Sequence, residues 1–146
     1  MKTASTLLAL VLLGHPFLSF YQTVSTPEEV IARSLETGAL DGHTIKMAGR
    51  MGDASAVAVT RVVADRPLRP EEIQSVLGIL TESFADPRLV ENPADREPRT
   101  ALFVLRYLDA TTTDTSMRAQ IAETLRYILD HFSKYQASEA SSTPPK

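Results

Sequence analysis

The side chains that could act as a catalytic base in this chain are few and lie far apart. The histidines are His15, His43 and His131, and only His43 has an acid nearby in the sequence, at Asp41. An aspartate two residues away could orient a histidine as a general base. A histidine in a polar turn without a catalytic role is the more frequent situation, so this pair by itself does not indicate an enzyme.

Two pairs of adjacent acids, Glu28–Glu29 and Glu71–Glu72, are better explained as helix starts than as catalytic dyads. Each pair follows a proline, acids in a first helical turn stabilise the helix dipole, and adjacent helical residues do not face each other. The chain has no cysteine, which excludes disulfides, thiol catalysis and cysteine metal sites. It also lacks the motifs of zinc hydrolases, serine hydrolases and phosphate-binding loops. We therefore expect no cofactor and no metal site, and a protein without catalytic activity is favoured.

A proline-containing loop offers the best candidate for a binding site. Residues 86–98 contain three prolines and cannot form a continuous helix, and loops on rigid scaffolds often carry recognition. Arg88, Arg96 and Arg99 lie in or beside this loop, and the acids near them are Glu91, Asp95 and Glu97. The arginines could pair with the carboxylates of a protein partner. Alternatively, they neutralise the acids of their own loop and hold it in place.

Apolar residues at helical spacing predict six helices, which would position these side chains. Their expected bounds are 27–37, 42–50, 53–65, 70–85, 99–109 and 116–135. Two helix caps are expected: Thr26, which forms a capping-box spacing with Glu29, and Asp53, which precedes an apolar run. The strongest core helix should be 70–85, whose apolar stripe consists of Ile73, Val76, Leu77, Leu80 and Phe84. We expect an all-α domain, residues 26–135, built from successive antiparallel pairs.

The stretch from 42 to 65 contains two short helices separated at a glycine, and small apolar residues dominate the second helix. Its distinctive residues are Gly52, Asp53, Ala56, Val57 and Arg61. With these residues the stretch resembles one unit of a HEAT-type helical repeat, in which an aspartate caps a second helix rich in alanine and valine. The resemblance implies a short HEAT-like α-solenoid. The alternative is a small helical bundle with one Gly-Asp turn.

The first 25 residues have the layout of a secretory signal peptide. Lys2 precedes the apolar run Leu7–Leu13, which matches a basic start followed by a hydrophobic core. An uncleaved membrane anchor is the alternative, because residues 3–24 carry no formal charge and a span of that length can cross a bilayer core of about 30 Å. Both alternatives place the domain outside the cytoplasm. A cytosolic protein with an apolar first helix remains a third alternative.

Composition narrows the class of partner. The chain has 146 residues and a formal net charge of −3, and a mildly acidic protein is not expected to bind nucleic acid. Residues 136–146 have the composition of a disordered tail. We expect an exported helical module that binds a protein partner, with membrane contact only through an uncleaved N-terminal segment. The alternatives are an enzyme, or enzyme subunit, with a carboxylate site that the sequence does not reveal, and a membrane-tethered regulator.

Overall fold

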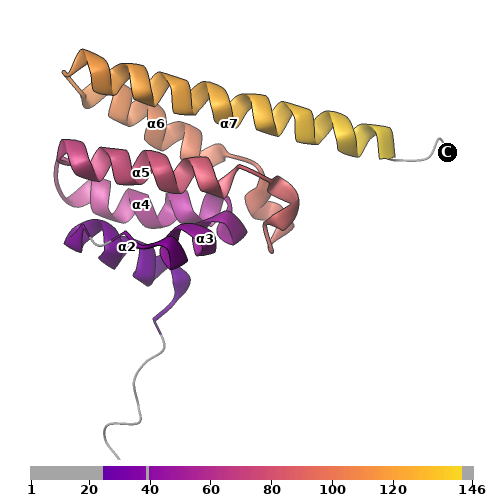
Figure 1. Cartoon of the computed structure of the whole chain (residues 1–146), viewed down its shortest axis with the longest axis horizontal. Coiled ribbons are helices and arrows are strands. Elements are labelled where there is room, and N and C mark those ends of the chain that lie inside the picture. The colour runs from indigo at the N-terminus through magenta and orange to yellow at the C-terminus, as the bar shows by residue number, and fades with distance from the viewer. Residues whose placement is uncertain (1–24, 39, 143–146) are drawn as a thin grey trace, which may run out of the picture.

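Helices account for the whole architecture of the computed structural model, which describes residues 25–38 and 40–142 (Figure 1). In these residues there is no β-strand, and the prediction of an all-α fold is confirmed. The elements in order are α2 (Pro27–Thr37), α3 (Gly42–Met51), α4 (Asp53–Asp65), α5 (Pro70–Ser83), the 3-10 helices η2 (Pro87–Leu89) and η3 (Pro93–Arg96), α6 (Arg99–Thr111) and α7 (Thr115–Ser142).

The six α-helices form two layers. In one layer α2 packs on α4 and α4 packs on α6, and in the other α3 packs on α5 and α5 packs on α7. Neighbours within a layer are parallel: the start of α4 at Asp53 lies against the start of α6 at Thr100, and Gly49 and Glu82 meet near the ends of α3 and α5. Consecutive helices are antiparallel and lie in opposite layers, so the chain consists of three stacked pairs. In Figure 1, α5 and α7 lie nearer to the viewer than α4 and α6.

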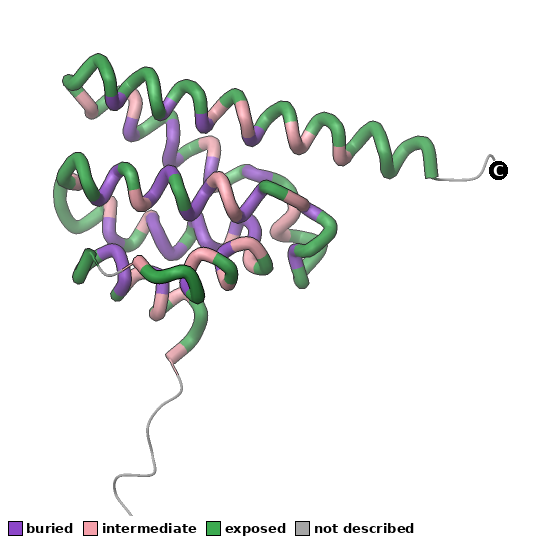
Figure 2. The backbone as a smooth tube through the Cα atoms, in the orientation of Figure 1, coloured by how far each residue is buried: buried purple, intermediate pink, exposed green. Residues whose placement is uncertain are grey.

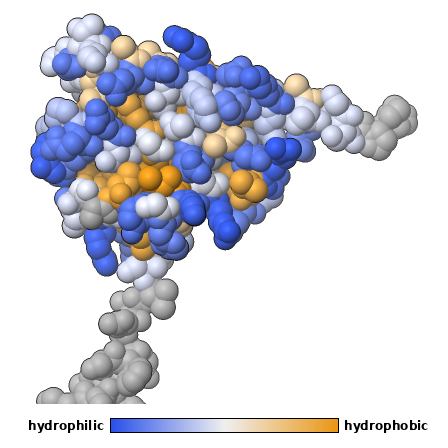
Figure 3. All heavy atoms as spheres, in the orientation of Figure 1, coloured by the Kyte–Doolittle hydropathy of each residue, from blue (hydrophilic) through white to orange (hydrophobic). Residues whose placement is uncertain are grey.

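The core lies between the two layers, and α5 contributes most to it. All five residues of its predicted stripe are buried: Ile73, Val76, Leu77, Leu80 and Phe84. Figure 2 shows buried residues along the sides of α4 and α5 that face other helices. On the near side, Figure 3 shows several hydrophobic patches within a mostly hydrophilic surface. Small residues on α4, including Ala56 and Ala58, are fully buried, which allows α4 to lie close to its neighbours on both sides.

Most helix starts depend on local sequence. Thr26 occupies the N-cap of α2, where its side chain accepts a hydrogen bond from the Glu29 N–H and the Glu29 side chain accepts one from the Thr26 N–H. Proline is at the first position of both α2 and α5, where it is suited to helix initiation. Asp41 caps α3 by accepting a hydrogen bond from the Thr44 N–H at 2.7 Å.

The C-terminal helix is longer than its sequence pattern suggests. α7 runs to Ser142, whereas we expected it to end at residue 135 and a disordered tail to begin at 136. Alanine favours helix in this segment, and the hydroxyls of Ser138, Ser141 and Ser142 donate to carbonyls three or four residues earlier. The signal peptide or anchor expected at residues 1–25 lies outside the described residues except for Ser25. Of the helices that the structure describes, none combines the length and apolar character needed to span a membrane.

Candidate functional site

Two of the three arginines expected to contact a partner are paired with acids of their own loop. The guanidinium group of Arg88 makes two hydrogen bonds to the Asp86 carboxylate, at 2.8 and 3.0 Å. Arg99 donates to Glu97 at 2.7 Å. These bonds lower the pKa of the Asp86 and Glu97 carboxyls, and the largest cause in each case is the hydrogen bond from the arginine. The alternative of a self-neutralised loop therefore describes Arg88 and Arg99.

Arg96 joins the loop to α7. Its two terminal nitrogens lie 3.4 Å from the Tyr135 hydroxyl and 3.4 Å from the Val90 carbonyl oxygen. Its Nε is buried and has no hydrogen-bond partner in the described residues. Arg88 also lies near Tyr135, since both line a small hollow of about 300 Å³ between η2 and α7. The structure thus places Arg88 and Arg96 near one end of α7, and Arg99 at the start of α6.

We expected Asp53 to cap its own helix, and this prediction is wrong. Gly52 occupies the N-cap position of α4, and no side chain caps this helix. The Asp53 carboxylate instead accepts hydrogen bonds from the Thr100 N–H at 2.8 Å and the Ala101 N–H at 2.9 Å, at the start of α6. The first N–H groups of a helix have no partner within the helix, and Pro98 at the N-cap of α6 supplies no side-chain acceptor. Asp53 therefore joins the second and third helix pairs.

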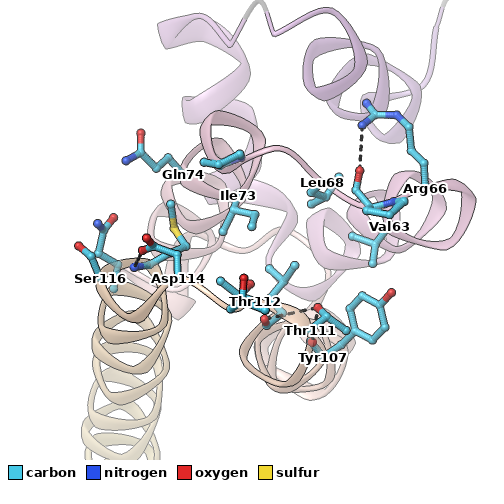
Figure 4. Close-up of a pocket in the computed structure, with 16 residues that line it drawn as sticks. Val63, Arg66, Leu68, Ile73, Gln74, Tyr107, Thr111, Thr112, Asp114 and Ser116 are labelled. Carbon is cyan, nitrogen blue, oxygen red and sulfur yellow. Dashed lines mark hydrogen bonds between the residues drawn. The ribbon is translucent and has the colours of Figure 1, made fainter.

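A cleft of about 640 Å³ lies between the α4–α5 turn and the α6–α7 turn (Figure 4). Val63, Leu68 and Ile73 supply apolar lining, and the α6–α7 turn adds hydroxyl groups from Thr111 to Ser116. The one carboxylate that lines it, Asp114, accepts the Met117 N–H at 2.7 Å. Neither histidine nor cysteine lines the cleft.

Asp41, considered above with His43, and His131 both make local hydrogen bonds. Asp41 is occupied in capping α3, and the hydrogen bond to Thr44 lowers the pKa of its carboxyl, with His43 as a smaller cause. His131 places Nδ1 2.9 Å from the Tyr127 carbonyl oxygen. Among the residues that the structure describes, no three metal-binding side chains gather in a way that could hold an ion.

A buried carboxylate near the cleft holds the α4–α5 turn together. The Glu72 side chain is 2% exposed and accepts hydrogen bonds from the guanidinium group of Arg66, at 2.6 and 2.8 Å, and from that of Arg69 at 3.0 Å. The backbone N–H of Arg69 adds a bond at 2.7 Å. These donors, first Arg66 and then Arg69, hold the pKa of Glu72 far below its usual range. Glu72 therefore remains ionised in the folded protein.

This ion pair should make stability depend on pH. Because the Glu72 pKa is lower in the folded than in the unfolded chain, its contribution is present above about pH 4.5 and is lost progressively as the pH falls below that value. We expect Glu72→Gln to lower the free energy of unfolding by about 1–2 kcal/mol at pH 7 and by less at pH 3. Urea unfolding at both pH values measures this difference. Glu71→Gln is the control, since Glu71 is exposed, and equal losses at both pH values would contradict the assignment.

Exposed apolar side chains gather on the outer side of α4 and α6. Phe103 is 65% exposed, Val57 42% and Tyr107 41%, and the other large apolar side chains with comparable exposure in the described residues are Leu89 and Leu129. Two contacts fix the register of these parallel helices. The Asp53 carboxylate accepts a hydrogen bond from the Thr100 N–H near their starts, and Val63 and Tyr107 both line the cleft near their ends. We define the α4–α6 face by its exposed residues, which are Val57, Arg61, Ala64, Arg99, Phe103, Arg106, Tyr107 and Ala110.

No family model, curated protein or solved structure matches this chain. The HEAT-like resemblance of residues 42–65 therefore stays a prediction.

The α4–α6 face was not among the sites expected from sequence. A signal was present in the sequence, since Phe103 lies beside the apolar set formed by Leu102, Leu105 and Leu108, and Tyr107 follows Phe103 one turn later. Arg106 is indistinguishable in sequence from the other arginines, which alternate with acids along the chain, and Arg61 is distinguished only by the HEAT-like resemblance. Only the layer arrangement shows that they lie beside exposed apolar residues on one surface.

Proposed function

We propose that the chain is a non-enzymatic protein-binding module whose binding surface is the α4–α6 face. The observation that supports this is the exposure of Phe103, Val57 and Tyr107 on two adjacent helices. Aromatic side chains surrounded by arginine are typical of binding hot spots. An aromatic side chain left two-thirds exposed gives little to the folded chain, whereas its burial by a partner would contribute about 1.5–3 kcal/mol.

A binding role also agrees with the state of the buried acids. In the described residues the buried carboxylates are Asp53 and Glu72, and each already accepts several hydrogen bonds from its own chain. They are occupied in holding helices together. We propose export as part of the same function, which rests on the order of Lys2 and Leu7–Leu13 in the sequence.

Site-specific photo-cross-linking tests the binding surface. The full-length protein would carry a photoreactive phenylalanine analogue at Phe103 in the cells that produce it, and a matched protein would carry it at Glu123, which is exposed on α7 in the other layer. We expect one discrete adduct from position 103 and none from position 123. Adducts that are equal at both positions, or absent from both, would contradict the proposal.

A charged side chain at Phe103 on the α4–α6 face should abolish partner binding without changing the stability of the fold. Phe103→Glu is expected to change the free energy of unfolding by no more than about 0.5 kcal/mol, because the side chain is exposed. The same substitution should abolish the partner complex, since a carboxylate would be desolvated in the interface. Urea unfolding measures the change in stability. Co-purification of the partner that photo-cross-linking has identified measures the loss of binding. A complex that survives Phe103→Glu would place the binding surface elsewhere.

A further inference from the structure

The α4–α6 face combines exposed apolar residues with a surplus of positive charge. Arg61 and Arg106 are exposed, and the described residues provide neither with a hydrogen bond or an ion pair. Arg99 adds a third cation at the edge, although its charge is balanced by Glu97. Apart from that pair, the acids nearest in sequence are Asp109, three residues after Arg106 and paired with Arg118, and Asp65, four residues after Arg61 at the end of α4. A binding partner would therefore meet two guanidinium groups, beside the aromatic residues, that make no ion pair within the described residues.

The spacing of the apolar side chains fits a helix laid across α4 and α6. The structure describes no strand, so no sheet edge is present in that part of the chain to bind an extended peptide by strand addition. Packed helices lie about 8–10 Å apart, and positions i and i+7 of a helix lie about 10 Å apart along its axis. An apolar side chain at position i of a docked helix can thus reach Val57 on α4, while one at position i+7 reaches Phe103 and Tyr107 on α6.

We infer that the α4–α6 face binds an acidic amphipathic helix of its protein partner. The inference rests on the proposed function and names the chemistry of the partner. Apolar side chains one or two turns apart on that helix cover Phe103, Tyr107 and Val57. Carboxylates flanking them form charge-assisted hydrogen bonds to Arg61 and Arg106. A basic helix would be rejected, because it would place like charges against both arginines.

Selection from a library of displayed helical peptides tests this inference. Each peptide has fixed leucines at i, i+4 and i+7, and the flanking positions vary among Glu, Lys, Gln and Ser. The target is the full chain, compared with an Arg61→Glu/Arg106→Glu variant. The matched control is Lys46→Glu/Arg126→Glu, which makes the same change in net charge at two exposed, unpaired cations on α3 and α7.

We expect glutamate to be enriched at the flanking positions. The Kd of a selected peptide should rise at least tenfold on the double charge reversal and less than twofold in the control. The Kd should also rise with ionic strength, because salt screens exposed charge pairs. Enrichment of lysine or of neutral residues, or an equal Kd in the reversed variant, would overturn the inference. Binding of a single-stranded oligonucleotide as tight as that of the selected peptide would also overturn it.

The two proposals can fail separately. Neutral or basic selected peptides that still cross-link from position 103 would leave the binding surface in place and remove only the acidic partner. A library in which no peptide distinguishes the wild type from Phe103→Glu would overturn the inference, and the absence of an adduct from position 103 in cells would then overturn the proposed function as well.

Discussion

Gly52→Ala is expected to lower the free energy of unfolding by about 2–6 kcal/mol, the largest effect of any single substitution considered. Gly52 has φ +57° and ψ −129°, a backbone conformation that side chains rarely adopt and that costs about 1–3 kcal/mol. A methyl group there would also overlap the carbonyl oxygen of Asp95 and lie 2.9 Å from a methyl of Val90. Overpacking of this kind costs about another 1–3 kcal/mol.

A second glycine provides the control for this experiment. Gly78 is exposed within α5, and a Cβ there would meet no atom within 4 Å. Gly78→Ala should therefore stabilise the protein by about 0.5–1 kcal/mol, as expected for glycine in a helix interior. Urea unfolding of both variants measures the contrast. If Gly52→Ala were as stable as the wild type, the loop of residues 86–98 could not pack against the α3–α4 junction as described.

Asp53→Ala is expected to lower the free energy of unfolding by about 2–4 kcal/mol. It removes the acceptor of two N–H groups, and Ala101, which donates one of them, is fully buried. A buried donor left without a partner costs about 1–3 kcal/mol, and the start of α6 also loses a favourable negative charge. Asp53→Asn should cost less, because one oxygen remains to accept a hydrogen bond.

Amide hydrogen exchange can show whether the Asp53 side chain stabilises the start of α6 or caps α4. Amide hydrogen exchange of the Asp53→Ala protein should accelerate at Thr100 and Ala101, and the first amides of α4 should change little. Asp65→Ala is the control at the other end of the same helix, since Asp65 is exposed and unpaired, and it should leave stability nearly unchanged. Faster exchange confined to the first turn of α4 would show that Asp53 caps its own helix in solution.

The helices were predictable because their signals are local. Proline at the first position, the Thr26–Glu29 capping box and the stripe from Ile73 to Phe84 all act within a few residues, so the sequence alone contains their causes. The pairing of Arg99 with Glu97 is also local, so ion pairing within the loop can be stated as an alternative from the sequence. Asp86, which pairs with Arg88, is not among the acids named there.

The candidate site could not be predicted because it depends on contacts between distant segments. The carboxylate of Asp53 meets the N–H of a residue 47 positions later, and nothing near Asp53 in the sequence distinguishes this from a local cap. In the same way, Val57 and Phe103 belong to one surface only because α4 and α6 are parallel neighbours in one layer. The length of α7 was underestimated for a different reason, since serine-rich composition favours neither helix nor coil strongly.

The end of α7 extends beyond the two layers, and Figure 1 shows its last turns without a neighbouring helix. Residues 136–142 are all exposed, so tertiary packing stabilises them little. Ser138 lines the hollow beside Arg88, and the charge of Glu139 is one of the causes that raise the pKa of Arg88. A sparsely packed helical end of this kind follows helix–coil statistics: it lengthens on cooling and melts back toward Tyr135 on warming, well below the temperature at which the core unfolds. Far-ultraviolet circular dichroism of this protein should therefore show a sloping folded baseline, whereas near-ultraviolet signals from the core stay flat until the main transition.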